Sequence, residues 1–392
     1  MDLDFLYGVI ELSFWGYVLL AFVLVQITFM AVTLYLHRDA THRSLDLHPA
    51  LRHFFRFWLW FASGMLTREW GAVHRKHHAR CETPDDPHSP VIFGLKKVLL
   101  EGAELYKAAA ADPQVLEKFG RGTPDDWIER NLYQRHRALG ITVLVITDLV
   151  LFGVPGILIL SAQLMAVPLL AAGVVNGLGH HSGYRNFECP DAARNIVPWG
   201  FLLAGEELHN NHHAFPSSAK FSIRPWEFDL GWVYIKVFSA LGLAKVRRVA
   251  PTLVRSPQRE EIDVETLRAV LINRMHVLRD YAKTVTIPVC REQLRSAAGS
   301  GWRRAKKLLV RDTSLLDERA QQSLSELLAS NAKLKTVYEF RERLNVLWSG
   351  AHTSNERLLE HFKHWIADAE ASGLEVLRDY ARTIRGAALA QR

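Results

Sequence analysis

The sequence has few cysteines and no recognisable secretion signal. Its three cysteines, Cys81, Cys189 and Cys290, are odd in number and show neither disulfide nor metal-ligand spacing. This excludes a disulfide-stabilised scaffold and fits a reducing, cytosol-facing compartment. The N-terminus lacks the basic segment of a signal peptide, so we expect the first apolar run to be retained as a membrane anchor.

Basic residues are missing from two long stretches. No Lys or Arg precedes Arg38, and none lies between Arg137 and Arg185, although the formal net charge is +7. Basic residues that concentrate between apolar runs mark cytoplasmic loops of a membrane protein, and we do not expect nucleic acid to be a partner. From about residue 255 onward the chain is charged and has no run long enough to cross a bilayer. We therefore predict a membrane domain over residues 1–250 and a soluble helical region of unknown role over 256–392.

Long apolar runs are present in the first half. Residues 13–36 contain no charge, and the runs 138–152 and 155–179 are joined by a Gly/Pro turn, so we predict three membrane spans. Asp148 lies within the second span and should face protein or the interface. The run 53–66 is shorter and contains Arg56, and we predict that it is re-entrant or interfacial.

Eight histidines form three clusters beside these runs. They occur in the sequences HRDATHRS from His37, HRKHHA from His74 and GEELHNNHHAFP from Gly205. Imidazole is the commonest protein ligand of transition metals, and residues three and four apart share a helix face. Each HxxHH triple can therefore point at one site, whereas His37 and His42 are five apart and converge less easily on an ideal α-helix. A shared metal site also requires all clusters to lie on one side of the membrane.

These motifs resemble the three histidine boxes of the membrane fatty-acid desaturases, specifically the acyl-CoA Δ9 (stearoyl-CoA) group. The resemblance covers about residues 13–250 and includes the Asp-Pro-His at 86–88. It implies an all-α membrane bundle with a cytosolic cap that holds a non-haem di-iron centre, two Fe ions in all. The expected ligands are His37, His42, His74, His77, His78, His180, His209, His212 and His213, with Asn176 acting through water.

Carboxylates near the boxes are candidates for orienting the imidazoles, as metal-bound histidines usually need. They are Asp39, Glu69, Asp86, Glu206 and Glu207. Candidates for binding the substrate head group are Arg75, Lys76, Lys96 and Lys97. Ala72 and Gly173 stand where animal acyl-CoA members have an Arg and a Trp that help to bind CoA, so the carrier of the acyl chain stays open among CoA, acyl carrier protein and phospholipid.

The reaction implied is O₂-dependent formation of a cis double bond, at Δ9, in a long-chain acyl group, with CoA as the expected carrier. The chain has no flavin or haem motif, so electrons must come from a separate ferredoxin, rubredoxin or flavin reductase, or from cytochrome b5 in a eukaryote. We expect a bacterial inner-membrane protein with an outside N-terminus and with the histidine boxes and C-terminus in the cytoplasm. The alternatives are a di-iron fatty-acyl hydroxylase or other oxygenase and, from another class, a metal transporter or sensor.

The C-terminal region contains a near repeat. Residues 277–285 (VLRDYAKTV) recur as 376–384 (VLRDYARTI), which indicates duplicated or convergent amphipathic helices. We predict six helices here, with breaks at Pro288, at 299–301, at Gly350 and at Gly373.

Overall fold

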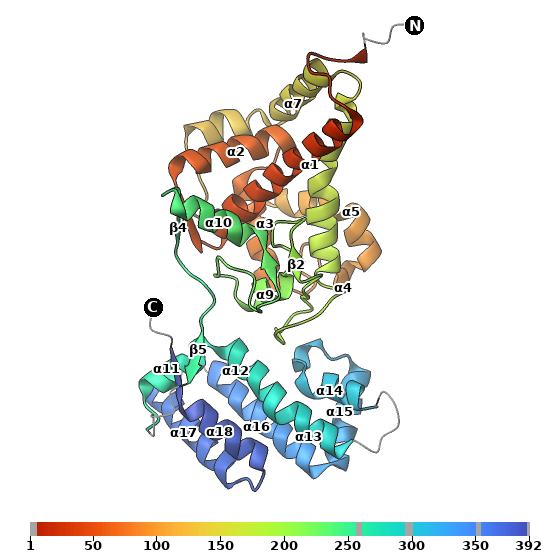
Figure 1. Cartoon of the computed structure of the whole chain (residues 1–392). Coiled ribbons are helices and arrows are strands. Elements are labelled where there is room, and N and C mark those ends of the chain that lie inside the picture. Colours follow the sequence, from red (N-terminus) through yellow and green to blue (C-terminus); the bar gives the residue numbers. More distant parts are fainter. Residues whose placement is uncertain (1–5, 256–260, 295–300, 350–353, 390–392) are drawn as a thin grey trace. The chain divides into compact units, whose positions relative to one another are not determined.

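The structure is a computed structural model that describes residues 6–255, 261–294, 301–349 and 354–389. It divides into two compact units, each drawn in Figure 1. The N-terminal unit comprises Met1–Arg185 and Asp191–Ala250, and the C-terminal unit comprises Pro251–Arg392 together with the short segment Asn186–Pro190. Both are mostly helical and their strands form only two-stranded pairs, so the prediction of an all-α fold is confirmed.

The N-terminal unit begins with a helix capped by the Ser13 hydroxyl, which accepts a hydrogen bond from the Gly16 amide. Its α and π helices are α1 (Phe14–Met30), η2 (Ala31–Thr41), α2 (Pro49–Ser63), α3 (Thr67–Arg80), α4 (Pro90–Phe93), α5 (Leu95–Ala110), α6 (Pro113–Phe119), η3 (Glu129–Gln134), α7 (Arg137–Phe152), α8 (Gly156–Ala166), η4 (Val167–Leu178), α9 (His209–Ala214) and α10 (Leu230–Ala240). Strand β1 (Leu45–Leu47) pairs antiparallel with β4 (Ala244–Val246), and β2 (Trp199–Gly200) pairs parallel with β3 (Phe228–Asp229).

Two helices in the described chain are long and apolar enough to cross a membrane, Phe14–Thr41 and Gly156–Leu178. The expected middle span corresponds to α7, which has 16 residues. Asp148 on α7 is buried and accepts a hydrogen bond from the Gln163 amide of α8 at 2.9 Å, so it faces protein as expected. The three-span topology stays a prediction.

Glycine permits close contact between α5 and η4. A Cβ on Gly102 would lie 2.6 Å from the Ala172 carbonyl oxygen, and one on Gly173 would lie 2.8 Å from that of Leu99. The structure thus explains why position 173 carries no large side chain: the α5 backbone occupies the space that such a side chain would need.

The C-terminal unit surrounds its own apolar core. Its helices are α11 (Val264–Ile272), α12 (Arg274–Tyr281), η5 (Ala282–Thr286), α13 (Ile287–Gln293), α14 (Gly301–Val310), η6 (Thr313–Leu315), α15 (Glu318–Ser330), α16 (Ala332–Ser349), α17 (Asn355–Ala371) and α18 (Glu375–Arg385), and strand β5 (Leu253–Arg255) pairs antiparallel with β6 (Ala387–Leu389). The break expected at Pro288 was wrong, because this proline lies in the first turn of α13, where no amide hydrogen is needed. Of the other expected breaks, residues 299 and 300 and Gly350 lie outside the described residues.

The two repeated segments of this unit pack against each other. Tyr281 and Tyr380 occupy equivalent positions in the repeat, and their rings meet edge to face with centroids 5.0 Å apart. The Tyr281 hydroxyl donates to the Val337 carbonyl at 2.7 Å, and the Tyr380 hydroxyl donates to that of Val277 at 2.8 Å. The repeat therefore places two buried tyrosines with satisfied hydroxyls at the centre of the unit.

Candidate metal centre

The first histidine box lies on the π-helical segment η2. The His42 amide donates to the His37 carbonyl at 3.0 Å, a hydrogen bond between residues five apart. In such a turn residues i and i+5 lie nearly above one another, and the two rings have centroids 5.0 Å apart. The doubt about this spacing was based on an ideal α-helix and does not apply, because the backbone is π-helical here.

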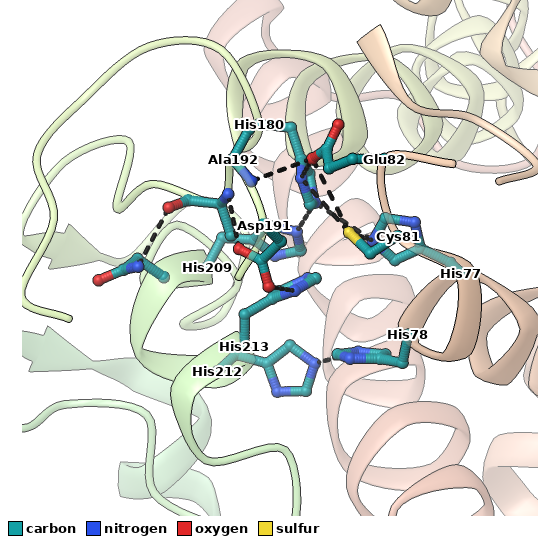
Figure 2. A network of polar contacts seen from close by, with 12 residues as sticks. His77, His78, Cys81, Glu82, His180, Asp191, Ala192, His209, His212 and His213 are labelled. Carbon is teal, nitrogen blue, oxygen red and sulfur yellow. Dashed lines mark hydrogen bonds and ion pairs between the residues drawn. The ribbon is translucent and has the colours of Figure 1, made fainter. Parts of the chain in front are cut away.

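The second box lies on the last turns of α3 and the third on the short helix α9. Together with His180, which follows η4, they form two groups of imidazoles. The first group comprises His37, His42, His74, His78 and His212, and their ligand atoms lie within 4.8 Å of one another. The second group contains His77, His180 and His213 by the same measure, and the His209 Nε2 lies 2.9 Å from the His180 Nε2. Figure 2 shows the second group from close by.

Four carboxylates lie within hydrogen-bond distance of the Nδ1 atoms of four of these rings. The Nδ1 atoms of His37 and His77 lie 2.8 Å from Glu206 and 3.0 Å from Asp86. Those of His180 and His213 lie 2.8 Å from Glu82 and 3.1 Å from Asp191. An ionised carboxylate only accepts hydrogen bonds, so each Nδ1 carries a proton, and the Nε2 of the neutral ring then keeps a lone pair for a metal ion.

The lone pairs face one another. The Nε2 atoms of His77 and His180 are 3.2 Å apart, and two neutral rings that carry their proton on Nδ1 have none there to donate. Such a contact between two acceptors is repulsive unless a cation lies between them. With metal–nitrogen bonds of about 2.1 Å, donors at right angles would be about 3.0 Å apart, which matches this distance. The residues therefore fit a metal ion at each group.

Burial keeps the other imidazoles neutral. It holds the pKa values of His74 and His78 well below their ordinary range, and neighbouring histidines lower them further. Burial opposes ionisation of Asp86, but hydrogen bonds from His77 and the His88 amide outweigh it and hold the pKa of this carboxyl below its usual range. Neutral rings beside ionised carboxylates are the protonation states that a metal ion requires.

Three of the carboxylates expected to orient histidines do something else. Asp39 accepts two hydrogen bonds from the Arg52 guanidinium, and Glu69 pairs with Arg137. Glu207 accepts from the amides of Leu203 and Gly205 and so shapes the loop before the third box. The partners of these three side chains are a guanidinium or backbone amides, and none of the three forms a hydrogen bond with an imidazole among the described residues, so a role in orienting histidines stays a prediction for them.

Two carboxylates in these roles were missed, Glu82 and Asp191. Glu82 follows the second box by four residues, but its histidine partner is 98 residues away in sequence. Asp191 and His213 are separated by 22 residues and lie on different segments. His88, which is buried and stacks on His77 with centroids 4.5 Å apart, belongs to the expected Asp-Pro-His motif, and its ring nitrogens have no partner among the described residues.

Asn176 is not joined to the second group by any hydrogen bond among the described residues. Asn176 lies on η4, which is π-helical and ends at Leu178, and His180 lies beyond the end of this helix. Asn176 and His180 are four residues apart, but the rule that residues four apart share a face holds for an α-helix and does not apply here. The neighbouring His181 is exposed and contacts Ser182 instead of the group.

Arg75 does not present its charge to a substrate. Its guanidinium donates to the carbonyls of Ala40, Thr41, Phe119 and Arg121 and so ties three segments together. Because these donors are already used by backbone carbonyls, the structure gives no support to the head-group role expected for Arg75. Lys96 and Lys97 are exposed and Lys76 is partly buried, and their role stays a prediction.

The N-terminal part of the chain is similar to fatty acid desaturases. The family model described as fatty acid desaturase matches residues 13–247. The chain is 30% identical to the probable lipid desaturase ADS3.2, chloroplastic, of Arabidopsis thaliana, over 59% of this chain and 62% of that protein. It is also 30% identical to the Delta-9 desaturase-like 5 protein of the same organism, over 59% of this chain and 76% of the relative. The sn-1 stearoyl-lipid 9-desaturase of Synechocystis is 33% identical over 60% of this chain and 73% of its own length.

The C-terminal region has a different similarity. A family model described as transposase matches residues 268–388, which lie within the C-terminal unit. The three relatives match only about three fifths of this chain.

Proposed function

The chain belongs to the fatty acid desaturase family, and from that premise we propose that it introduces a cis double bond, at the Δ9 position, into a long-chain acyl group at a non-haem di-iron centre. The observation that carries the proposal is the pair of imidazole groups whose Nε2 lone pairs converge while carboxylates hold the opposite nitrogens. Relatives named as Delta-9 or 9-desaturases support the position of the double bond.

The proposed iron ligands are the nine histidines of the two groups, five in the first and four in the second. When bound, the two iron ions would supply O₂ activation, and the net reaction converts two adjacent methylenes, O₂, two electrons and two protons into one double bond and two waters. The imidazoles would hold the ions and exclude water, because most of them are buried. Glu206, Asp86, Glu82 and Asp191 would keep four rings in the correct tautomer and orientation.

We propose a lipid as the carrier of the acyl chain. The sequence favoured CoA, but two of the compared relatives are named lipid or stearoyl-lipid desaturases. The guanidinium of Arg75, a candidate for binding the CoA end, is occupied by backbone carbonyls. Exposed Lys96 and Lys97 would suit the phosphate of either carrier, so the two carriers are compared directly in the experiment below.

We place the protein in a membrane, with the bacterial inner membrane as the expected location. Large apolar side chains are exposed along α1, α7 and α8, among them Trp15, Leu19, Ile146 and Leu158. Such faces suit lipid contact. We place the histidine boxes in the cytoplasm, where an external ferredoxin, rubredoxin or flavin reductase would deliver electrons.

The test is expression of the full chain in a host whose lipids are saturated, with a working electron donor, followed by lipid analysis that locates double bonds. We expect a new cis-Δ9 product with the full chain and none with His180→Ala, whereas His181→Ala, a neighbour outside both groups, should keep activity. Membranes supplied with acyl-CoA or with saturated glycerolipid then identify the carrier. A hydroxylated acyl product would favour the oxygenase alternative, and iron-loaded protein without any oxidised product would refute the proposal.

A further inference from the structure

Six large apolar side chains are exposed around the parallel pair of β2 and β3, beside the loop that leads into the third histidine box. We call this surface the aromatic patch, and its members are Val197, Trp199, Phe201, Leu202, Trp226 and Phe228. Trp199 and Trp226 are 68% and 62% exposed, although tryptophan is highly buried on average. The sequence has no charged residue from 195 to 205. A contiguous exposed apolar surface marks contact with a protein, a ligand or a membrane.

The carboxylates of this region point inward while the apolar side chains point outward. Successive side chains of a strand lie on opposite faces, and here Trp226 and Phe228 are exposed whereas Glu227 and Asp229 are buried. The Asp229 carboxylate accepts a hydrogen bond from the Arg38 guanidinium at 3.0 Å, inside the unit. An apolar outer face with the charges turned into the protein is the arrangement required beside lipid and not beside water.

The aromatic patch continues onto α1, which belongs to a helix long and apolar enough to cross a membrane. The ring of Phe201 stacks on that of Phe22 of α1, with centroids 6.5 Å apart and planes 21° apart. Leu19, one turn before Phe22, is also exposed. The Gln26 side-chain amide of α1 donates to the Leu202 carbonyl at 3.0 Å. This hydrogen bond satisfies a carboxamide donor and a backbone oxygen, which acyl chains cannot do.

We propose that the aromatic patch is inserted into the lipid bilayer beside α1, as a membrane contact in addition to the expected spans, an inference that rests on the proposed membrane placement. The bilayer is the occupant that fits, because the patch adjoins the exposed face of a candidate span and because indole rings gather at membrane interfaces. Leu202 precedes Glu206, the carboxylate that holds His37, by four residues. The bilayer thus comes within one short loop of the imidazole groups, and an acyl chain attached to a membrane lipid approaches them without crossing water.

Fluorescence quenching of the full-length protein in lipid nanodiscs tests this insertion. The thiol-reactive dye NBD is attached to Trp199→Cys, to Trp226→Cys, to Leu19→Cys on α1 and to Glu318→Cys, an exposed control position of the C-terminal unit. The unaltered chain, whose own cysteines are buried or partly buried, gives the labelling background. We expect lipids with brominated acyl chains to quench the dye at positions 199, 226 and 19, and aqueous iodide to quench it only at position 318.

Quenching at position 19 by lipid but at 199 and 226 by iodide would overturn the inference, and so would protection of the patch from both quenchers, which would mean that protein covers it. Absence of lipid quenching at position 19 would instead refute the membrane placement, so the two failures are distinguishable. The unaltered protein covers the case in which a variant does not fold. A lipid with a photoreactive group on its acyl chain should label the tryptic peptides 195–220 and 221–236, and labelling of peptide 1–38 alone contradicts the inference.

Discussion

Replacement of Asp86 by Asn should weaken the second metal position without unfolding the protein. The buried Asp86 carboxylate accepts from the His77 Nδ1 at 3.0 Å and from the amides of Glu82 and His88 at 2.9 and 3.1 Å. Asn has the same shape and keeps one oxygen for the backbone. It loses the negative charge and one of the two accepting oxygens, so the His77 ring is no longer held in the tautomer that exposes its Nε2 lone pair.

Loss of a carboxylate behind a metal-bound histidine typically costs about 10- to 100-fold in metal affinity or activity, which corresponds to about 1.4–2.7 kcal/mol. The assay is competition of the full-length protein with a chromophoric chelator, together with desaturation in membranes. Asp85→Asn is the matched control, because Asp85 is the exposed neighbour and makes the same charge change. Equal metal affinity in Asp86→Asn and Asp85→Asn would refute the reasoning that this carboxylate orients a ligand.

Three further substitutions test the surrounding structure. Gly205→Ala should reduce the metal bound per chain, because it strains the loop that precedes the third histidine box: φ is +101° and the new Cβ would lie 2.3 Å from the Asp229 Oδ1. Gly242→Ala is the control and should not reduce bound metal, because its φ is also positive, at +73°, but its Cβ would lie in open space. Asp126→Asn should remove only the part of the acid sensitivity that this carboxyl contributes. Hydrogen bonds from Arg56 lower the pKa of Asp126 to about 2 from 3.8, so its stabilisation is present above about pH 4 and is lost as the pH falls toward 2, which thermal unfolding of both proteins at several pH values would show. Trp365→Ala should destabilise the C-terminal unit by about 3–5 kcal/mol in denaturant titrations, because the buried ring leaves a cavity; a midpoint equal to that of the unaltered protein would contradict its place in the core.

Much of the helical architecture was predictable from apolar runs and turn residues. The expected segment 155–179 corresponds to α8 and η4, and the C-terminal helices α16 and α17 begin and end within one residue of the bounds expected from sequence, 333–348 and 354–370. The exceptions have physical causes. Pro288 was expected to break a helix but lies in a first turn, and the close contact at Gly173 depends on a backbone about 70 residues earlier in the chain.

The candidate ligands could be selected from sequence because their spacing is local. In His74, His77 and His78 the pattern of three and four residues keeps the rings near one helix face, and the third box repeats it. The π-helical geometry that brings His37 above His42 was not visible, because π turns arise within apparently ordinary helical sequence.

The hydrogen-bond partners of the candidate ligands could be identified only in the tertiary structure. Local spacing was enough to select the histidines. Carboxylates are common near helix ends, so the sequence alone did not show that Glu82 and Asp191, and not Asp39, Glu69 and Glu207, are the hydrogen-bond partners of histidines. The partners of His180 and His213 come from other segments. The candidate ligands of the second and third boxes follow from short spacings along one helix, whereas the tautomer and charge of their rings depend on contacts between segments distant in sequence, which periodicity does not encode.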